Sequence, residues 1–388
     1  MRIREVEAVW LHCPLDPARQ HTSDFGRISA FDGVLITITT EDGLVGYGEA
    51  KPAVGSAGNA AAIVAIVRHE LQPLLVGADA REIGRAWGSM YNGTRTPLAE
   101  RFGRAMPVLG RRGIHVAAMS GVDLALWDLA GKRRGVSVLE LVGGPARERI
   151  PAYASGGWAD AAGIGAELVR YVEQGFRAVK MRIGAMDGGV EASLARVRAA
   201  RQTLGPSIEI MVDAHGTLNV TQAKQFCAGA ASLGLRFVEE PVMSDDRAGL
   251  ALVRSSSPLA IAAGESEFGC FDFADLIARG AIDVLQPDLA IAGGLSEGLR
   301  IASLAYANRL ELAPHCWGSA ISFQAARTLA FASPAGVLIE VPMGGSPLLR
   351  EMAAIDMRLR EGALLPPTGL GFAVVPDPDF VRKFTQEC

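Results

Sequence analysis

The feature that most constrains the fold of this chain is a sequence pattern that repeats between residues 149 and 342. A short apolar run ends in polar or charged residues, a helical pattern follows, and the unit begins again. Strands that alternate with helices pair in parallel through crossover connections. Eight units over about two hundred residues have the count and size of a (β/α)₈ barrel. The eight runs are RIPAYASGG, RAVKMRIG, IEIMVDAHG, LRFVEEP, LAIAAGES, IDVLQPDL, LELAPHCW and GVLIEVP.

The residues before this repeat follow different patterns. Residues 1–48 alternate as antiparallel strands do and include a hairpin that turns at Asp42 and Gly43. Within them, residues 13–33 have no period, which predicts a long loop of the kind that is often functional or mobile. Over residues 60–134 the apolar side chains recur at three- and four-residue steps, as they do in helices.

These patterns predict an α/β chain with two domains. We expect an α+β domain over residues 1–135, a (β/α)₈ barrel over residues 136–359, and a tail over residues 360–388 that returns to the first domain. A doubly wound sheet is the alternative for the repeating part, but no GxGxxG segment follows its first strand.

The composition excludes several classes of function. Lys and Arg number 38 and Asp and Glu number 42, a net charge of −4, which argues against nucleic acid and against an anionic membrane as partner. The five cysteines are scattered and form no CxxC pair, as expected in a reducing compartment. The amino-terminal residues are charged and alternating, and no apolar run is long enough to span a bilayer. We therefore expect a soluble, cytoplasmic protein.

Carboxylates follow three consecutive strands of the predicted barrel. Asp213, Glu239 and Glu265 are spaced 26 residues apart, which is one strand–helix unit each. Three carboxylates at one barrel mouth repel one another unless a cation lies between them. Mg²⁺ prefers carboxylate oxygens, whereas no Cys or His pair has the spacing of a zinc site. The alternative is that each acid caps the following helix or faces solvent.

The other strands also carry polar side chains. Lys180 and Arg182 lie two residues apart and so point to the same side of their strand, where they either meet anions or extend along the barrel rim. Asp288 and His315 follow adjacent strands, so the carboxylate could hold the imidazole as a general base requires, although a lone His is more often structural. Glu340, on the last strand, is a candidate donor or acceptor for developing charge.

Taken together, these segments resemble the enolase superfamily in its mandelate racemase and muconate-lactonizing branch. The resemblance extends over essentially the whole chain, and within the branch the sequence is most similar to acid-sugar dehydratases and uronate cycloisomerases. The segments that carry it are VDAHG, FVEEP, AAGES, QPDLAIAGG, APHCWGS and LIEVP in the barrel, with SGVDLALWDLAGK and GLVGYGE outside it.

The resemblance implies a role for most of these side chains. It implies Mg²⁺ as the cofactor, bound by the three carboxylates, which holds the substrate carboxylate and stabilises an enediolate. It further implies that His315, with Asp288, is the base at carbon 2, that Lys180 contacts the substrate carboxylate, and that Glu340 hydrogen-bonds the enediolate. Many relatives carry a second Lys where this chain has Arg182, and arginine stays protonated, so single-base chemistry is favoured.

The resemblance also implies that the first domain caps the barrel mouth and selects the substrate. The candidate substrate-binding residues in that domain lie in the long loop and near the end of the hairpin: His21, Asp24, Arg27 and the segment around Lys51. Those in the barrel are expected at strand ends: Tyr153, His215 and Trp317. Each capping residue could instead be a solvated surface residue, and His215 could support Asp213.

These inferences predict a Mg²⁺-dependent dehydratase that acts on a small-molecule carboxylate, an aldonate or aldarate, and gives a 2-keto-3-deoxy acid. Alternatives on the same chemistry are a cycloisomerase of sugar lactones or muconate-like acids, or an epimerase. An alternative of another class is a non-catalytic homologue that binds metal and a carboxylate. We also expect a homo-oligomer.

Overall fold

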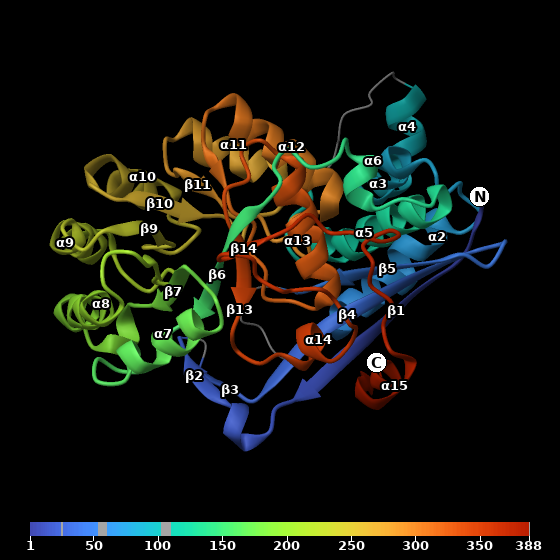
Figure 1. Cartoon of the computed structure of the whole chain (residues 1–388). Helices are drawn as coiled ribbons and strands as arrows, with labels where there is room; N and C mark the ends of the chain where they lie inside the picture. The colour runs from blue at the N-terminus through green and yellow to red at the C-terminus, as the bar shows by residue number, and fades with distance from the viewer. Residues whose placement is uncertain (25, 53–59, 102–109, 388) are drawn as a thin grey trace.

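The computed structural model describes residues 1–24, 26–52, 60–101 and 110–387. It contains an amino-terminal domain of antiparallel strands and helices beside a barrel of parallel strands and helices (Figure 1). No helix in these ranges is both long enough and apolar enough to cross a membrane.

The amino-terminal domain is built on a four-stranded antiparallel sheet in the order β15-β1-β4-β5. The predicted hairpin is confirmed, because β4 pairs with β5 across a turn in which Gly43 has φ +84°. The strands are β1 (Ile3–Pro14), β4 (Ala30–Thr40), β5 (Val45–Ala50) and β15 (Thr385–Gln386).

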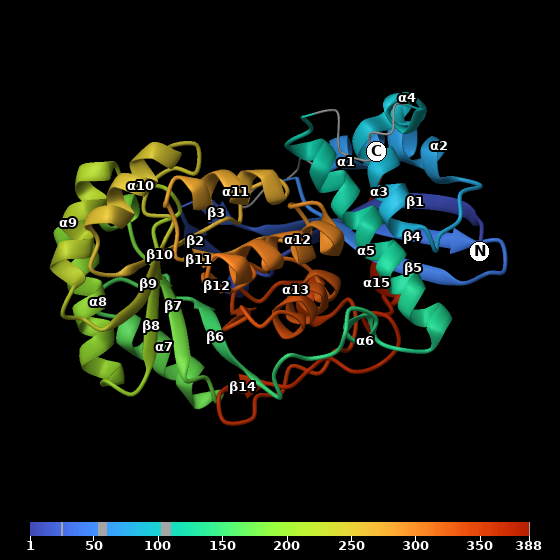
Figure 2. The same cartoon turned by 90° about the horizontal axis from the view of Figure 1, so that it is seen from above.

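Helices cover one face of this sheet. The longest, α5, packs both on β5 and on the barrel helix α12, and so joins the two domains (Figure 2). The helices are α1 (Ala61–Ile66), the π-helical turn η2 (Val67–Leu71), α2 (Gln72–Leu75), α3 (Ile83–Asn92), η3 (Gly93–Arg95), α4 (Thr96–Arg101) and α5 (Ile114–Arg134).

The eight predicted strands form the barrel, and all their pairings with one another are parallel. The two end strands of the ladder meet through Leu312, whose N–H donates to Ala335 O at 2.8 Å and whose carbonyl accepts from Val337 N at 3.0 Å. These bonds close the (β/α)₈ barrel. The strands are β6 (Ile150–Gly156), β7 (Ala178–Arg182), β8 (Glu209–Asp213), β9 (Leu235–Glu239), β10 (Ala260–Ala263), β11 (Val284–Leu285), β12 (Glu311–Leu312) and β13 (Ile339–Pro342).

Helices surround the barrel, and one layer of side chains fills its interior. Six strands contribute one buried apolar residue each to that layer, and the residues directly after β12 and directly before β13 complete it: Tyr153, Ala178, Met211, Phe237, Ala262, Val284, Ala313 and Leu338. The helices are α6 (Val138–Leu141), α7 (Ile164–Glu173), η4 (Ala185–Asp187), α8 (Val190–Leu204), α9 (Val220–Ala230), α10 (Arg247–Ser256), α11 (Cys270–Ala278), α12 (Gly294–Ala307), α13 (Ala320–Ala332) and α14 (Pro347–Arg350). The barrel is therefore a packed core with its open end at the strand termini.

The carboxyl-terminal tail completes the amino-terminal domain, as expected. It first pairs with the barrel, where β14 (Ala363–Leu364) lies antiparallel to β6, and it then reaches the other domain. There α15 (Pro378–Phe384) packs on β1, and β15 pairs with the same strand. The exact domain limits proposed from the sequence stay predictions.

Residues 13–33 are more ordered than the absence of a period suggested. They contain η1 (Pro17–Arg19) and a small hairpin of β2 (His21–Ser23) and β3 (Gly26–Ile28). Strands of three residues are too short to show alternation. The hairpin extends from the capping sheet to the barrel near α7 (Figure 1), where the His21 ring lies 4.2 Å from that of Trp158.

Candidate active site

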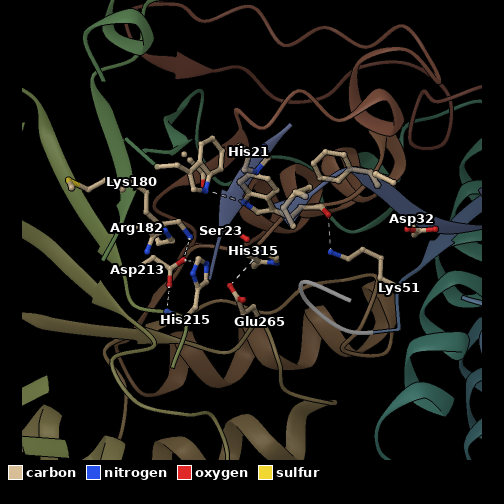
Figure 3. A pocket seen from close by; sticks show the side chains of 18 of the residues that line it. His21, Ser23, Asp32, Lys51, Lys180, Arg182, Asp213, His215, Glu265 and His315 are labelled. Atoms are coloured by element: carbon tan, nitrogen blue, oxygen red, sulfur yellow. Dashed lines mark hydrogen bonds and ion pairs between the residues drawn. The ribbon is translucent and has the colours of Figure 1, made fainter. Parts of the chain in front are cut away.

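A cavity lies where the carboxyl ends of the barrel strands meet the capping domain (Figure 3). Both domains contribute residues to its wall, including His21, Asp32, Lys51, Lys180, Arg182, Asp213, His215, Glu265, His315 and Trp317. The position agrees with the rule that barrel chemistry takes place at this end of the strands.

Asp213, Glu239 and Glu265 come together beside this cavity, where Asp213 and Glu265 line its wall. Asp213 and Glu239 end adjacent strands in register, and Glu265 follows β10 by two residues. One carboxylate oxygen from each lies within 4.8 Å of the others, and all three side chains are buried. The geometry predicted for the three carboxylates is therefore present, and it fits a hard divalent cation.

The electrostatics of the cluster also fit a cation. Burial, with the nearby charge of Asp213, raises the pKa of Glu239 to about 7, and burial likewise raises the pKa of Glu265. The Oε2 atom of Glu265 is buried and accepts no hydrogen bond from the described residues, although His315 Nε2 lies 3.3 Å away. Carboxylates in this state are stabilised in the charged form when a metal ion is bound.

Lys180 lies among the acidic side chains. Its Nζ is 2.6 Å from Glu239 Oε1 and 3.1 Å from both Asp213 Oδ2 and Glu340 Oε1. Burial favours the neutral amine, but these carboxylates raise the pKa of Lys180 well above its usual value. The side chain is therefore a buried cation at the mouth of the barrel.

His315 and Asp288 form a dyad between adjacent strand ends. The His315 Nδ1 atom is 2.8 Å from Asp288 Oδ2, which leaves Nε2 directed at the cavity, 3.3 Å from Glu265 Oε2. Asp288 Oδ2 is also 2.7 Å from the Nζ of Lys51, which reaches in from the end of β5. Despite burial, Lys51 and His315 hold the pKa of Asp288 well below its usual value. The carboxylate therefore stays charged and can orient the imidazole.

Glu340 is buried beside His315, with its Oε2 atom 3.9 Å from the Nε2 atom of the imidazole. Its Oε2 accepts a hydrogen bond from Cys316 N at 2.8 Å, and its Oε1 accepts one from Trp317 Nε1 at 3.2 Å. The carboxylate thus supports the loop that carries His315, in addition to its contact with Lys180.

Arg182 is held by the capping domain. Its Nη1 lies 2.9 Å from Asp24 Oδ1, and Asp24 Oδ2 lies 2.8 Å from His215 Nδ1. The other ring nitrogen of His215 lies 3.1 Å from Asp213 Oδ2. A chain of contacts therefore runs from the capping hairpin to the carboxylate cluster, and His215 supports Asp213 as the alternative interpretation expected.

Three candidate substrate-binding residues do not line this cavity: Asp24, which is paired with Arg182 and His215, and also Arg27 and Tyr153. Arg27 is exposed on β3, where its Nε donates to Gln20 Oε1 at 3.0 Å. Tyr153 lies in the middle of β6, not at its end, and belongs to the interior layer below the cavity. The expected strand-end position of Tyr153 was wrong because β6 continues to Gly156, so the side chain sits one layer deeper.

Several cavity residues were not proposed from the sequence. Trp158 follows β6 and meets the ring of Trp317 edge to face at 5.9 Å, and its place just after a strand could have indicated it. Phe31 and Asp32 lie at the start of β4 and line the opposite wall. They carry no sequence signal, because their contact with the cavity depends on how the capping domain is docked on the barrel.

The fold and the strand-end carboxylates define a capped barrel enzyme of the enolase type. Sequence comparison gives the family: this chain belongs to the mandelate racemase and muconate lactonizing enzyme family. The amino-terminal domain of that family matches residues 7–143, and an enolase C-terminal domain-like model matches residues 163–380. The predicted resemblance is thereby confirmed.

Characterised relatives differ in activity. The chain is 32% identical to a D-galactarolactone cycloisomerase of Agrobacterium fabrum, with 90% of each chain covered. It is 34% identical to a D-galactonate dehydratase of Ralstonia nicotianae, again with 90% of each covered. Relatives at nearly the same sequence identity therefore include both a dehydratase and a cycloisomerase.

Solved structures give the same family. A 3,6-anhydro-D-galactonate cycloisomerase from Zobellia galactanivorans superposes with a TM-score of 0.84 at 28% identity, with 100% of both chains covered. A racemase from Streptomyces coelicolor with bound magnesium has a TM-score of 0.85 at 29% identity, covering 99% of this chain and 100% of that one.

Proposed function

We propose that this protein is a Mg²⁺-dependent dehydratase of a sugar acid, which forms a 2-keto-3-deoxy acid. The observation that carries the proposal is the pairing of the cavity's basic groups. His315 presents a ring nitrogen to the cavity with Asp288 behind it, whereas Arg182 is a guanidinium paired with Asp24. A racemase needs a second group that can take and return a proton, and a guanidinium cannot do so.

Asp213, Glu239 and Glu265 would hold the metal, since their oxygens converge and their charges need a cation. When bound, Mg²⁺ supplies the positive charge that stabilises an enediolate derived from the substrate carboxylate. Lys180 adds a fixed cation beside the same carboxylate, and Glu340 is close enough to Lys180 to share a hydrogen-bonded network with it. Charge stabilisation that exists only after the proton leaves lowers the barrier to that step.

His315 would carry the proton in both steps. Its Nε2 takes the proton from carbon 2, and the electrons of the C–H bond form the enediolate. Asp288 stabilises the resulting imidazolium through Nδ1. The imidazolium then returns the proton to the departing 3-hydroxyl, the C3–O bond breaks, water leaves, and the enol product tautomerises to the ketone. Both transfers use one face of the substrate, so syn elimination is expected.

A cycloisomerase of sugar lactones is the second candidate. Trp158, Trp317 and Phe31 line the cavity with aromatic side chains, which suits a substrate with a ring of its own. The two cycloisomerases among the relatives support this alternative. We also propose that the protein is cytoplasmic and forms a homo-oligomer.

The test is turnover of aldonates and aldarates in D₂O with Mg²⁺, followed by NMR and by a ketone assay. We expect a 2-keto-3-deoxy product and no build-up of the carbon-2 epimer. His315→Asn should lower both turnover and deuterium exchange by at least about 10²-fold. His69→Asn, on the exposed face of η2, is the matched control and should leave both unchanged.

The other outcomes separate the alternatives. Deuterated epimer that accumulates at the rate of turnover would show two working bases and contradict the dehydratase. Exchange at carbon 2 without a ketone would favour a cycloisomerase or an epimerase. A wild-type protein with no exchange on any acid would favour a non-catalytic homologue.

A further inference from the structure

Lys51 is a buried cation of the capping domain to which the proposed reaction assigns no role. It follows β5 directly, and Figure 3 shows it on the opposite side of His315 from Lys180 and Arg182. Burial favours the neutral amine, but Asp288 raises the pKa of Lys51 above its usual value, so the side chain is an ammonium.

Two hydrogen bonds hold Lys51 in place at the ends of the barrel strands. Its Nζ donates to Trp317 O at 3.2 Å, in the loop after β12. Its backbone N–H donates to Ala290 O at 3.1 Å, in the loop after β11. The ammonium is thereby fixed between the loops that carry Asp288 and His315, and it lies 2.7 Å from Asp288 Oδ2.

This contact determines how the Asp288 carboxylate is oriented. Its Oδ1 accepts a hydrogen bond from Ala290 N at 2.8 Å, and its Oδ2 is held by Lys51. The torsion that turns a carboxylate is broad, so both oxygens must be held if the group is to keep one orientation. His315 Nδ1 lies 2.8 Å from the same Oδ2. Without the ammonium, the imidazole would be the only partner of Oδ2 among the described residues, and the two groups could turn together.

We propose that Lys51 is a positioning residue, which fixes Asp288 Oδ2 and thereby directs the imidazole of His315 at the carbon-2 proton. A general base acts well only when a further group orients it, and a misplacement of about 1 Å can cost about 10²-fold in rate. The inference rests on the proposed function in that His315 is the base, but it is independent of the reaction that follows proton removal. The capping domain would then complete the catalytic dyad.

Exchange of the carbon-2 proton in D₂O tests this role, since dehydration, cycloisomerisation and epimerisation all begin with removal of that proton. The probe is the aldonate or aldarate that the wild-type protein exchanges fastest with Mg²⁺, and NMR gives the rate as a function of its concentration. Lys51→Met should lower the maximum rate by about 10- to 100-fold. The KM should stay within about threefold, because the ammonium is bound to protein groups and not to the substrate.

Lys132→Met is the matched control. Lys132 is a second lysine of the capping domain whose Nζ lies 2.6 Å from the buried Asp128 and donates to Val45 O at 3.0 Å. These three residues do not line the cavity. Lys132→Met should therefore also lose stability, but its exchange rate should stay within about twofold of wild type.

A double-mutant cycle tests whether Lys51 acts through Asp288. In the Asp288→Asn background, the further change Lys51→Met should lower the exchange rate by less than about threefold, because the carboxylate that Lys51 holds is already absent. This comparison also gives an answer if Lys51→Met alone does not fold, since the double variant leaves neither charge of the pair uncompensated.

Three kinetic results would overturn the inference: an exchange rate of Lys51→Met within about threefold of wild type, an equal loss in Lys132→Met, or the full loss again in the Asp288→Asn background. If the wild-type protein exchanges no acid, the proposed function fails, and crystal structures decide on Lys51. The His315 ring should then be turned by more than about 30° in Lys51→Met and unchanged in Lys132→Met. An unturned ring in Lys51→Met would overturn the inference.

Discussion

Replacement of Lys51 tests how the capping domain supports the catalytic dyad. Its Nζ lies 2.7 Å from Asp288 Oδ2 and donates to Trp317 O at 3.2 Å, and the residue is 5% exposed. Methionine retains most of the apolar length of the side chain but removes the ammonium. Asp288 would then be a buried carboxylate without its lysine partner.

The magnitude follows from burial of the pair. Removal of one member of a buried ion pair typically costs about 3 to 5 kcal/mol, because the other charge is left uncompensated. With an unfolding entropy of about 2 cal/mol/K per residue, a chain of this length loses roughly 1.2 °C for each kcal/mol. Lys51→Met should therefore lower the melting temperature by about 4 to 6 °C.

Differential scanning calorimetry measures this shift. Lys224→Met, on the surface helix α9, is the matched control and should shift the melting temperature by less than about 1 °C. Lys51→Met/Asp288→Asn removes both charges and should be more stable than the sum of the single losses by at least about 1 kcal/mol. A melting temperature of Lys51→Met within 1 °C of wild type would refute the argument that the pair is buried and coupled.

Two further predictions concern the metal and pH. Mg²⁺ at about 100 times its dissociation constant should stabilise the fold by about 2.7 kcal/mol, which raises the melting temperature by roughly 3 °C. Asp213→Asn should abolish this shift, whereas the control Asp245→Asn, at an exposed position, should preserve it. Asp123 accepts a hydrogen bond from Ser296 N, and its burial raises the pKa of its carboxyl group from 3.8 to about 7. The folded state therefore binds this proton more tightly than the unfolded state does, so the free energy of unfolding falls as pH rises between these values. Asp123→Asn should accordingly gain about 2 to 3 kcal/mol relative to wild type between pH 5 and pH 8, as measured by melting temperature in the two buffers. A constant difference between the two proteins across that range would contradict the assignment, as would equal Mg²⁺ shifts in Asp213→Asn and wild type.

The sequence by itself determined the barrel and the place of its acidic residues. The eight runs each became a strand, and Asp213, Glu239 and Glu265 converge as their spacing predicted. This succeeds because parallel strands in a barrel all end at one rim, so a residue's position along its strand determines its place in space. The contact between Asp288 and His315 follows from the same rule.

The prediction was weaker where it depended on the exact end of a strand. Tyr153 was expected at the cavity but lies one layer below it. Hydrophobic patterns locate a strand but set its ends only to within a few residues. Two residues along a strand are enough to move a side chain from one layer of the barrel to the next.

Only the tertiary structure decided what the capping domain contributes. Asp24 meets Arg182 across 158 positions in the chain, and Lys51 meets Asp288. No local pattern encodes these contacts, since they depend on how one domain is docked on another. The order of strands places residues within a single sheet, whereas the pairing of charges in the cavity is set by packing between the two domains.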